Sequence, residues 1–188
     1  MNLPRHAVLL LVDVQKGFED EAYWGPRNNP RAEENMAKLL EAFRAAGRPV
    51  IFIQHCSQTP ASPLRAGKPG NEINPVVAPK GERIFQKTVH SAFINTPLER
   101  TLKGAAQDTL VICGITTDHC VSTTARMAGD MGFTAYVVDD ACHCHDRTTH
   151  DGRVIPAEQV HEAALASLHN EFGTVVTTQA VLEALALS

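Results

Sequence analysis

Unbroken apolar runs, rather than alternating ones, mark the strands that this sequence predicts. The two clearest are residues 7–12 (Ala-Val-Leu-Leu-Leu-Val) and residues 110–113 (Leu-Val-Ile-Cys). Four further strands are predicted over residues 49–54, 83–86, 134–138 and 174–176, with polar residues at one or both ends. Because an unbroken apolar run leaves no face for water, it predicts a strand covered on both sides, which is typical of parallel sheets.

Apolar residues at helical spacing follow most of these runs. The first predicted helix begins near Asn29-Pro30, with the proline in its first turn, and ends at Gly47. Further helices are predicted over residues 97–103, 117–131, 156–170 and 178–185, the last capped by Thr178. Alternation of strand and helix along the chain predicts a doubly wound, three-layer α/β sandwich with right-handed crossovers.

Composition excludes several classes of protein. A chain of 188 residues with a net charge of −4 gives no indication of a nucleic-acid or membrane partner. The N-terminal apolar run is cut by Asp13, so it is too short for a signal sequence or a membrane span. Five cysteines without the spacing of a disulfide framework predict a reducing, cytoplasmic location.

The stretch from Leu110 to Met131 is where the pattern first predicts chemistry. Its apolar run ends at Gly114, which allows a turn, and Thr117 or Asp118 can cap the helix that follows. Cys120 then falls in the first helical turn, where backbone N–H groups and the helix dipole are expected to lower the thiol pKa. We therefore interpret Cys120 as a nucleophile, although a cysteine is more often a small buried hydrophobic residue.

Two charged residues also fall at predicted strand ends. Asp13 ends the first run and Lys87 follows the run at 83–86. In an open α/β sheet, the ligand crevice lies outside the carboxyl ends of the strands. Asp13 could take the thiol proton from Cys120, Lys87 could stabilise both charges, and backbone N–H groups of Thr116 and Cys120 could form an oxyanion hole. The ordinary alternatives are a helix-capping aspartate and a solvated lysine.

Four segments in this order resemble the isochorismatase-like cysteine hydrolases. They are residues 11–18 (LVDVQKGF), 85–93 (FQKTVHSAF), 114–121 (GITTDHCV) and 138–141 (VDDA). That superfamily includes nicotinamidases, N-carbamoylsarcosine amidohydrolase, biuret hydrolase and ureidoacrylate amidohydrolase. The set is specific, although any one segment alone would be weak, and the resemblance predicts a single hydrolase domain over residues 1–188.

The resemblance implies both a topology and a set of site residues. It implies a six-stranded parallel sheet of order 3-2-1-4-5-6. It also implies a catalytic triad of Asp13, Lys87 and Cys120. A cis peptide between Ile115 and Thr116 is implied as well, which would aim a backbone N–H at the site.

The expected pocket and assembly follow from the same resemblance. Phe18 and Trp24 are expected to line the substrate pocket, and His119, beside the nucleophile, is a candidate for its polar lining. A homodimer or homotetramer is implied. The long Pro- and Gly-rich segment over residues 57–80 is predicted to be a lid or wall, since loops of this length are usually functional.

Two observations bear on metal binding. Metal-binding nicotinamidases place Asp-x-His after the second strand, whereas this chain reads Ile53-Gln54-His55 there, so neither a catalytic metal nor another cofactor is predicted. The run Cys142-His143-Cys144-His145-Asp146 contains metal-ligand types, but its C-x-C spacing is tighter than that of common zinc sites. Shaping the pocket or contacting another subunit is the alternative role for this run.

The sequence therefore predicts a metal-independent cysteine amidohydrolase. It would hydrolyse a C–N bond of a small amide, ureide or carbamoyl compound through a thioester on Cys120. Two alternatives stay open, a metal-assisted hydrolase of the nicotinamidase type and a non-hydrolytic thiol sensor or binding module of the same fold. No pattern in the sequence identifies the substrate.

Overall fold

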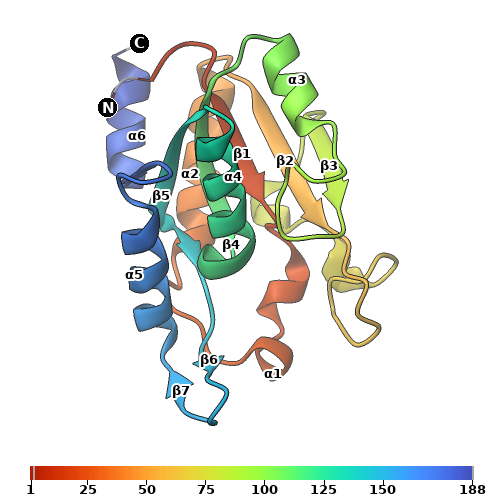
Figure 1. Cartoon of the computed structure of the whole chain (residues 1–188). Helices are drawn as coiled ribbons and strands as arrows, with labels where there is room; N and C mark the ends of the chain where they lie inside the picture. The colour runs from red at the N-terminus through yellow and green to blue at the C-terminus, as the bar shows by residue number, and fades with distance from the viewer. Residues whose placement is uncertain (2, 188) are drawn as a thin grey trace.

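A six-stranded parallel sheet forms the centre of the molecule in the computed structural model, which describes residues 1 and 3–187 (Figure 1). Its strands are β1 (Val8–Val12), β2 (Val50–His55), β3 (Arg83–Lys87), β4 (Thr109–Ile115), β5 (Thr134–His143) and β8 (Thr174–Val176). They are arranged in the order β3-β2-β1-β4-β5-β8, and every neighbouring pair is parallel. The predicted order 3-2-1-4-5-6 is confirmed, because β8 is the sixth strand of this sheet.

Helices cover both faces of the sheet and complete the three layers (Figure 1). The α-helices are α1 (Glu21–Trp24), α2 (Ala32–Ala45), α3 (Leu98–Gly104), α4 (Ser122–Asp130), α5 (Ala157–Leu168) and α6 (Thr178–Ala186). Helix α1 lies beyond the ends of the strands and not on a face of the sheet (Figure 1). Helices α2 and α6 pack against each other on one face, while α4 and α5 pack against each other on the opposite face. No helix in residues 1 and 3–187 has both the length and the apolar character that crossing a membrane requires.

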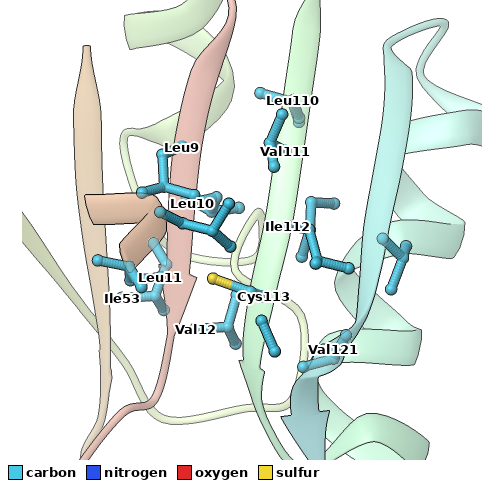
Figure 2. Close-up of a cluster of buried hydrophobic side chains, with 14 of the residues drawn as sticks. Leu9, Leu10, Leu11, Val12, Ile53, Leu110, Val111, Ile112, Cys113 and Val121 are labelled. Carbon is cyan, nitrogen blue, oxygen red and sulfur yellow. The ribbon is translucent and has the colours of Figure 1, made fainter. Parts of the chain in front are cut away.

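The central strands are buried as the apolar runs predicted. All five residues of β1 and all seven of β4 are buried. Figure 2 shows their side chains, among them Leu10 and Ile112, packed into a continuous apolar core. Each fully buried leucine or isoleucine contributes about 1.5–3 kcal/mol relative to an exposed one. The two strands that carry the candidate site residues Asp13 and Cys120 at their ends are therefore firmly held.

Gly114 lies at an irregularity of β4, one residue before the strand ends at Ile115. Its φ is +139°, and a Cβ at this position would lie 2.0 Å from the carbonyl oxygen of Val12 on β1. The register between β4 and β5 also shifts between Ile112 and Gly114. Only glycine allows β1 and β4 to approach this closely, so the chain can turn toward the nucleophile directly beside the end of β1.

Two helix starts differ from the prediction because side chains near them bind elsewhere. Helix α2 begins at Ala32 rather than near Asn29-Pro30, since Asn29 has a φ of +42° and its Nδ2 donates to the carbonyls of Asp140 and Cys142 on β5. The last helix is capped by Thr177, whose side-chain oxygen accepts a hydrogen bond from the backbone N–H of Ala180.

The C-terminal part of the sheet is longer than predicted. The acidic pair Asp139-Asp140 suggested a strand that ends at Val138, yet β5 continues to His143. Beyond it, β6 (Arg147–Thr148) and β7 (Val154–Ile155) form a short antiparallel hairpin that the sequence did not predict. The acidic residues stay in the strand because each binds a helix, Asp139 through His161 of α5 and Asp140 through Thr178 of α6.

Candidate functional site

The three predicted catalytic residues meet at the carboxyl ends of the strands. Lys87 Nζ lies 2.6 Å from Asp13 Oδ2 and 3.2 Å from Cys120 Sγ. Asp13 follows β1, Lys87 ends β3, and Cys120 lies in the turn after β4. The side chains of Asp13 and Lys87 are fully buried, and Cys120 is 7% exposed. The structure thus brings an acid, a cation and a thiol together; their assignment as a catalytic triad stays a prediction.

Asp13 is held in a conformation that aspartate rarely adopts. Its φ is +55°, in the left-handed region, which costs a non-glycine residue about 1–2 kcal/mol. Its Oδ2 bonds to Lys87, whereas its buried Oδ1 has no hydrogen-bond partner in the described part of the chain. An Asp13 oxygen lies within 4.8 Å of Cys120 Sγ. This carboxylate therefore has one oxygen committed to the ammonium group and one available for a proton.

The nucleophile turn, residues 116–121, starts at a cis peptide bond between Ile115 and Thr116. Residues 117–121 then form a single wide helical turn before α4 begins at Ser122. The carbonyl oxygen of Thr116 accepts hydrogen bonds from the backbone N–H groups of His119 and Val121. Cys120 thus lies in an irregular turn that precedes the regular helix, and not in the first turn of the helix itself.

The predicted caps of this helix bind other partners. Thr117 Oγ1 lies 2.8 Å from His161 Nδ1 on α5, and His161 Nε2 lies 2.8 Å from Asp139 Oδ1. Asp118 accepts two hydrogen bonds from Arg147, at 2.7 and 3.0 Å. The prediction that Thr117 or Asp118 caps the helix is wrong. Both side chains instead attach the nucleophile turn to α5 and to the hairpin.

The charge states in the site differ from the prediction in one respect. Burial raises the pKa of the Cys120 thiol, and the charge of Asp13 acts in the same direction while Lys87 opposes it. The predicted lowering of this pKa is wrong. Burial alone would lower the pKa of Lys87, but attraction to Asp13 and to Cys120 outweighs it and raises that pKa. The resting site therefore holds a protonated thiol beside an ammonium–carboxylate pair.

A cavity of about 300 Å³ opens over Cys120 and Asp13. The predicted lining residues Phe18, Trp24 and His119 all border it, as does Thr116. The rings of Phe18 and Trp24 stack at 4.9 Å, and Trp24 Nε1 donates to the carbonyl of Gly17. The pocket therefore has a flat aromatic wall close to the thiol.

The segment predicted as a lid or wall forms a second side of this cavity. Its lining residues are Ser57, Gln58, Thr59, Ser62 and Leu64. Asn71 ties the segment to β2, because its Nδ2 donates to the carbonyls of His55 and Leu64, each at 2.8 Å. Its backbone oxygen accepts from Gln15 Nε2 at 2.8 Å. These bonds to strand-end residues make the segment a wall of the site.

Two histidines of the pocket were missed by the sequence analysis. His55 and His90 border the cavity, and the ring centroid of His90 lies 6.4 Å from that of His55 and 5.8 Å from that of His119. His55 is the last residue of β2 and pairs in register with Lys87 on β3. The rule that identified Asp13 and Lys87, a polar residue at the carboxyl end of a predicted strand, could have identified His55 as well.

One group of side chains could hold a metal ion. Ligand atoms of Asp13, His55 and Cys120 lie within 4.8 Å of one another, and no other such group occurs in residues 1 and 3–187. Lys87 Nζ, however, lies 2.6 Å from Asp13, 3.2 Å from Cys120 and 3.2 Å from His55 Nδ1. A metal ion bound here would lie against this ammonium group. The three side chains are therefore better suited to hydrogen bonding with Lys87 than to binding a metal ion.

The Cys- and His-rich run at 142–146 contacts the aromatic wall of the pocket through His145. His145 stacks on Trp24 at 5.8 Å, and its Nδ1 lies 3.1 Å from the carbonyl of Gly25. His143 Nε2 lies 3.2 Å from Glu33 Oε1. Cys144 Sγ donates to the carbonyl of Ala157. This arrangement agrees with a role in shaping the pocket.

Comparison with known proteins adds the family. A family model of the isochorismatase domain matches residues 7–180. The chain is 45% identical to the uncharacterized isochorismatase family protein YrdC of Bacillus subtilis (strain 168), covering 93% of each chain. A crystal structure of a protein of the isochorismatase family from Chromobacterium violaceum is 39% identical, with a TM-score of 0.96 over 100% of this chain and 98% of that one.

A relative of named activity is more distant. Ureidoacrylate amidohydrolase RutB of Methylobacterium radiotolerans is 29% identical, with 97% of this chain and 80% of that one covered. The strand order, the match to the family model and the high coverage of these relatives all indicate the same family. This chain therefore belongs to the isochorismatase family of hydrolases.

Proposed function

We propose that this protein is a metal-independent cysteine amidohydrolase. It hydrolyses a C–N bond of a small amide, ureide or carbamoyl compound through a thioester on Cys120. The observation that carries this proposal is the contact of Lys87 with both Asp13, at 2.6 Å, and Cys120, at 3.2 Å, at the floor of an aromatic-walled cavity. The amidohydrolase among its relatives is consistent with C–N chemistry.

The first half of the reaction forms the thioester. Because the thiol pKa is raised, its proton leaves as the attack occurs, and the free Oδ1 of Asp13 accepts it. Cys120 Sγ bonds to the carbonyl carbon, and the carbonyl electron pair moves to oxygen. Backbone N–H groups of Thr116 and Cys120 stabilise that oxyanion. When the carbonyl re-forms, the C–N bond breaks and the nitrogen leaves with the proton from Asp13.

The second half releases the acid. Asp13 takes a proton from water, which attacks the thioester carbon, and the C–S bond breaks as the carbonyl re-forms. The sulfur leaves as a thiolate and recovers the proton from Asp13. Throughout the cycle the Lys87 ammonium lies against whichever of Asp13 and Cys120 is negative, and its raised pKa keeps it charged.

The two alternatives are weighed by the same contacts. The metal-assisted alternative is favoured by the proximity of Asp13, His55 and Cys120, and it predicts a bound transition metal and loss of turnover with a chelator. The sensor alternative requires an exposed thiol of low pKa. Cys120 is 7% exposed and its pKa is raised, so this alternative has little physical support.

The decisive experiment is an ammonia-release screen over small amides, ureides and carbamoyl compounds. We expect at least one compound to be hydrolysed by the wild type, unaffected by EDTA, and to leave an acyl group on Cys120 that mass spectrometry detects after rapid acid quench. Cys120→Ala should release none. Cys113→Ala, which removes a buried thiol of β4, is the matched control. Turnover that survives in Cys120→Ala would exclude the thioester route.

The assembly also stays a proposal. We expect a homodimer or homotetramer, and light scattering coupled to size-exclusion chromatography measures this directly.

A further inference from the structure

The environment of the Lys87 ammonium group contains a third acceptor besides Asp13 and Cys120. His55 Nδ1 lies 3.2 Å from Lys87 Nζ. An ammonium group carries three N–H donors, and here three acceptors surround it: a carboxylate, a sulfur and an imidazole nitrogen. Because the Lys87 side chain is fully buried, a donor without a partner would be costly. His55 therefore completes the hydrogen bonding of a buried cation.

The protonation state of His55 suits this role. A ring nitrogen can accept from an ammonium group only if it carries no proton, so His55 must be neutral with its proton on Nε2. Burial lowers the pKa of His55, and the charge of Lys87 lowers it further, against an opposing effect of Asp13. The nearby ring of His90 also lowers the pKa of His55. At neutral pH the imidazole is thus an acceptor facing Lys87.

The backbone of His55 is fixed on both sides, so the ring has a defined position. Its N–H donates to Gln15 Oε1 at 2.8 Å, and its carbonyl accepts from Gln15 Nε2 at 3.0 Å and from Asn71 Nδ2 at 2.8 Å. In-register pairing of β2 with β3 places His55 directly beside Lys87. The histidine is therefore part of the rigid strand-end framework.

We propose that His55 is a positioning residue of the hydrolase, which holds the Lys87 ammonium between Asp13 and Cys120. This inference rests on the proposed function. With two acceptors alone, one N–H of the buried ammonium would have no partner, whereas with His55 all three N–H groups are directed at acceptors. The consequence is that the ammonium stays aimed at Cys120 Sγ while the charge passes between sulfur and carboxylate.

Two substitutions separate the acceptor from the shape of the ring. His55→Phe keeps a planar ring but removes the acceptor. His55→Asn places an amide oxygen where Nδ1 lies and does not titrate. His6→Phe is the matched control, since it removes a histidine that bonds an acidic side chain, Asp108, outside the pocket. Thermal melting of all three variants verifies that each is folded.

The first readout is steady-state kinetics with whichever compound the ammonia-release screen identifies. We expect His55→Phe to lower kcat about tenfold with KM within about twofold, because one bond to a charged group is lost. His55→Asn should recover most of kcat, and His6→Phe should match the wild type. Equal loss in His55→Phe and His55→Asn, or no loss in His55→Phe, would overturn the proposal.

The second readout does not need a substrate. Alkylation of Cys120 by iodoacetamide, followed by mass spectrometry, should slow about fivefold in His55→Phe because the ammonium no longer stabilises the thiolate. At the same pH, His55→Asn should recover most of the wild-type alkylation rate, because its amide oxygen can still accept a hydrogen bond from Lys87.

The two readouts fail differently. If no compound is hydrolysed but alkylation follows the expected order, the proposed function fails while the role of His55 stands. If alkylation of His55→Phe matches the wild type at every pH, His55 does not position Lys87, whatever the substrate screen returns.

Discussion

Two regions of this molecule are rich in cysteine and histidine, and they differ in what surrounds those residues. The nucleophile turn, residues 116–121, places Cys120 against a buried ammonium group and beside a cavity. The run at 142–146 is richer in the same residue types, with two cysteines and two histidines, but its side chains bind backbone carbonyls, a glutamate and an aromatic ring. Burial raises the pKa of both Cys120 and Cys142. The difference therefore lies in the charged neighbours and the open space, and not in the thiols themselves.

The largest expected effect comes from removing the thiol of Cys120, compared with removing the thiol of Cys142. Cys120→Ala should reduce turnover by at least about 1,000-fold, as expected of a covalent nucleophile. Cys142→Ala should leave kcat within about twofold, with a small loss of stability from the cavity it creates. Ammonia release and thermal melting measure the two quantities. A comparable loss of turnover in Cys142→Ala would break the distinction between the two regions.

The next expected effect removes the ammonium group. Lys87→Met has a similar length without the charge, so it should lower kcat about 100-fold or more, because the thiolate loses its stabilising charge. It also leaves Asp13, His55 and Cys120 within 4.8 Å of one another with no cation between them. We therefore expect this variant to bind Zn²⁺ more tightly than the wild type does. Isothermal titration calorimetry tests this, and Lys16→Met, at an exposed ion pair with Glu72, is the matched control.

A third prediction concerns the stability of the run at 142–146. Glu33 accepts two hydrogen bonds from Arg27, both at 2.7 Å, and lies 3.2 Å from His143. Burial opposes ionisation of Glu33, yet the proximity of His143 and the hydrogen bonds from Arg27 outweigh it and hold the pKa of Glu33 well below 4.5. Because the pKa of this carboxyl is lower in the folded state than in the unfolded state, its ionisation stabilises the fold at every pH above the unfolded-state pKa. This contribution is lost progressively as the pH falls from the unfolded-state pKa towards the folded-state pKa.

Glu33→Gln should consequently lower the free energy of unfolding by about 1–3 kcal/mol at pH 7. The difference from the wild type should shrink in acid, as the wild type loses the same contribution. Urea titrations at neutral and acidic pH measure it. Glu34→Gln, at the neighbouring exposed ion pair with Arg31, is the control and should change stability far less. Equal losses in the two variants would show that the buried pair is no more important than the exposed one.

The smallest expected effect tests how α5 supports the nucleophile turn. His161→Leu removes the link between Thr117 and Asp139, so kcat should fall about three- to fivefold while the charged residues stay in place. His169→Leu, which removes a histidine at the end of the same helix without a bond to the turn, is the matched control. Identical kinetics of the two variants would show that the turn holds its shape without α5.

Local patterns in the sequence determined most of the framework. The unbroken apolar runs predicted β1 and β4 because a strand that is buried on both faces needs apolar residues at successive positions. Asp13, Lys87 and Cys120 were found because parallel strands bring their carboxyl ends to one edge, whatever the intervening chain does. The glycine at 47 marked the end of a helix because its positive φ is a local requirement.

Only the tertiary structure decided the electrostatics and the supporting contacts. Cys120 was expected to have a lowered pKa from its predicted position in the first turn of a helix, but its burial and the charge of Asp13 raise it. The bond from Lys87 to His55 joins residues 32 positions apart, and the bond from Lys87 to Asp13 joins residues 74 positions apart. Desolvation and charge–charge interaction depend on which distant residues pack together, and that information has no periodicity along the chain from which it could be predicted.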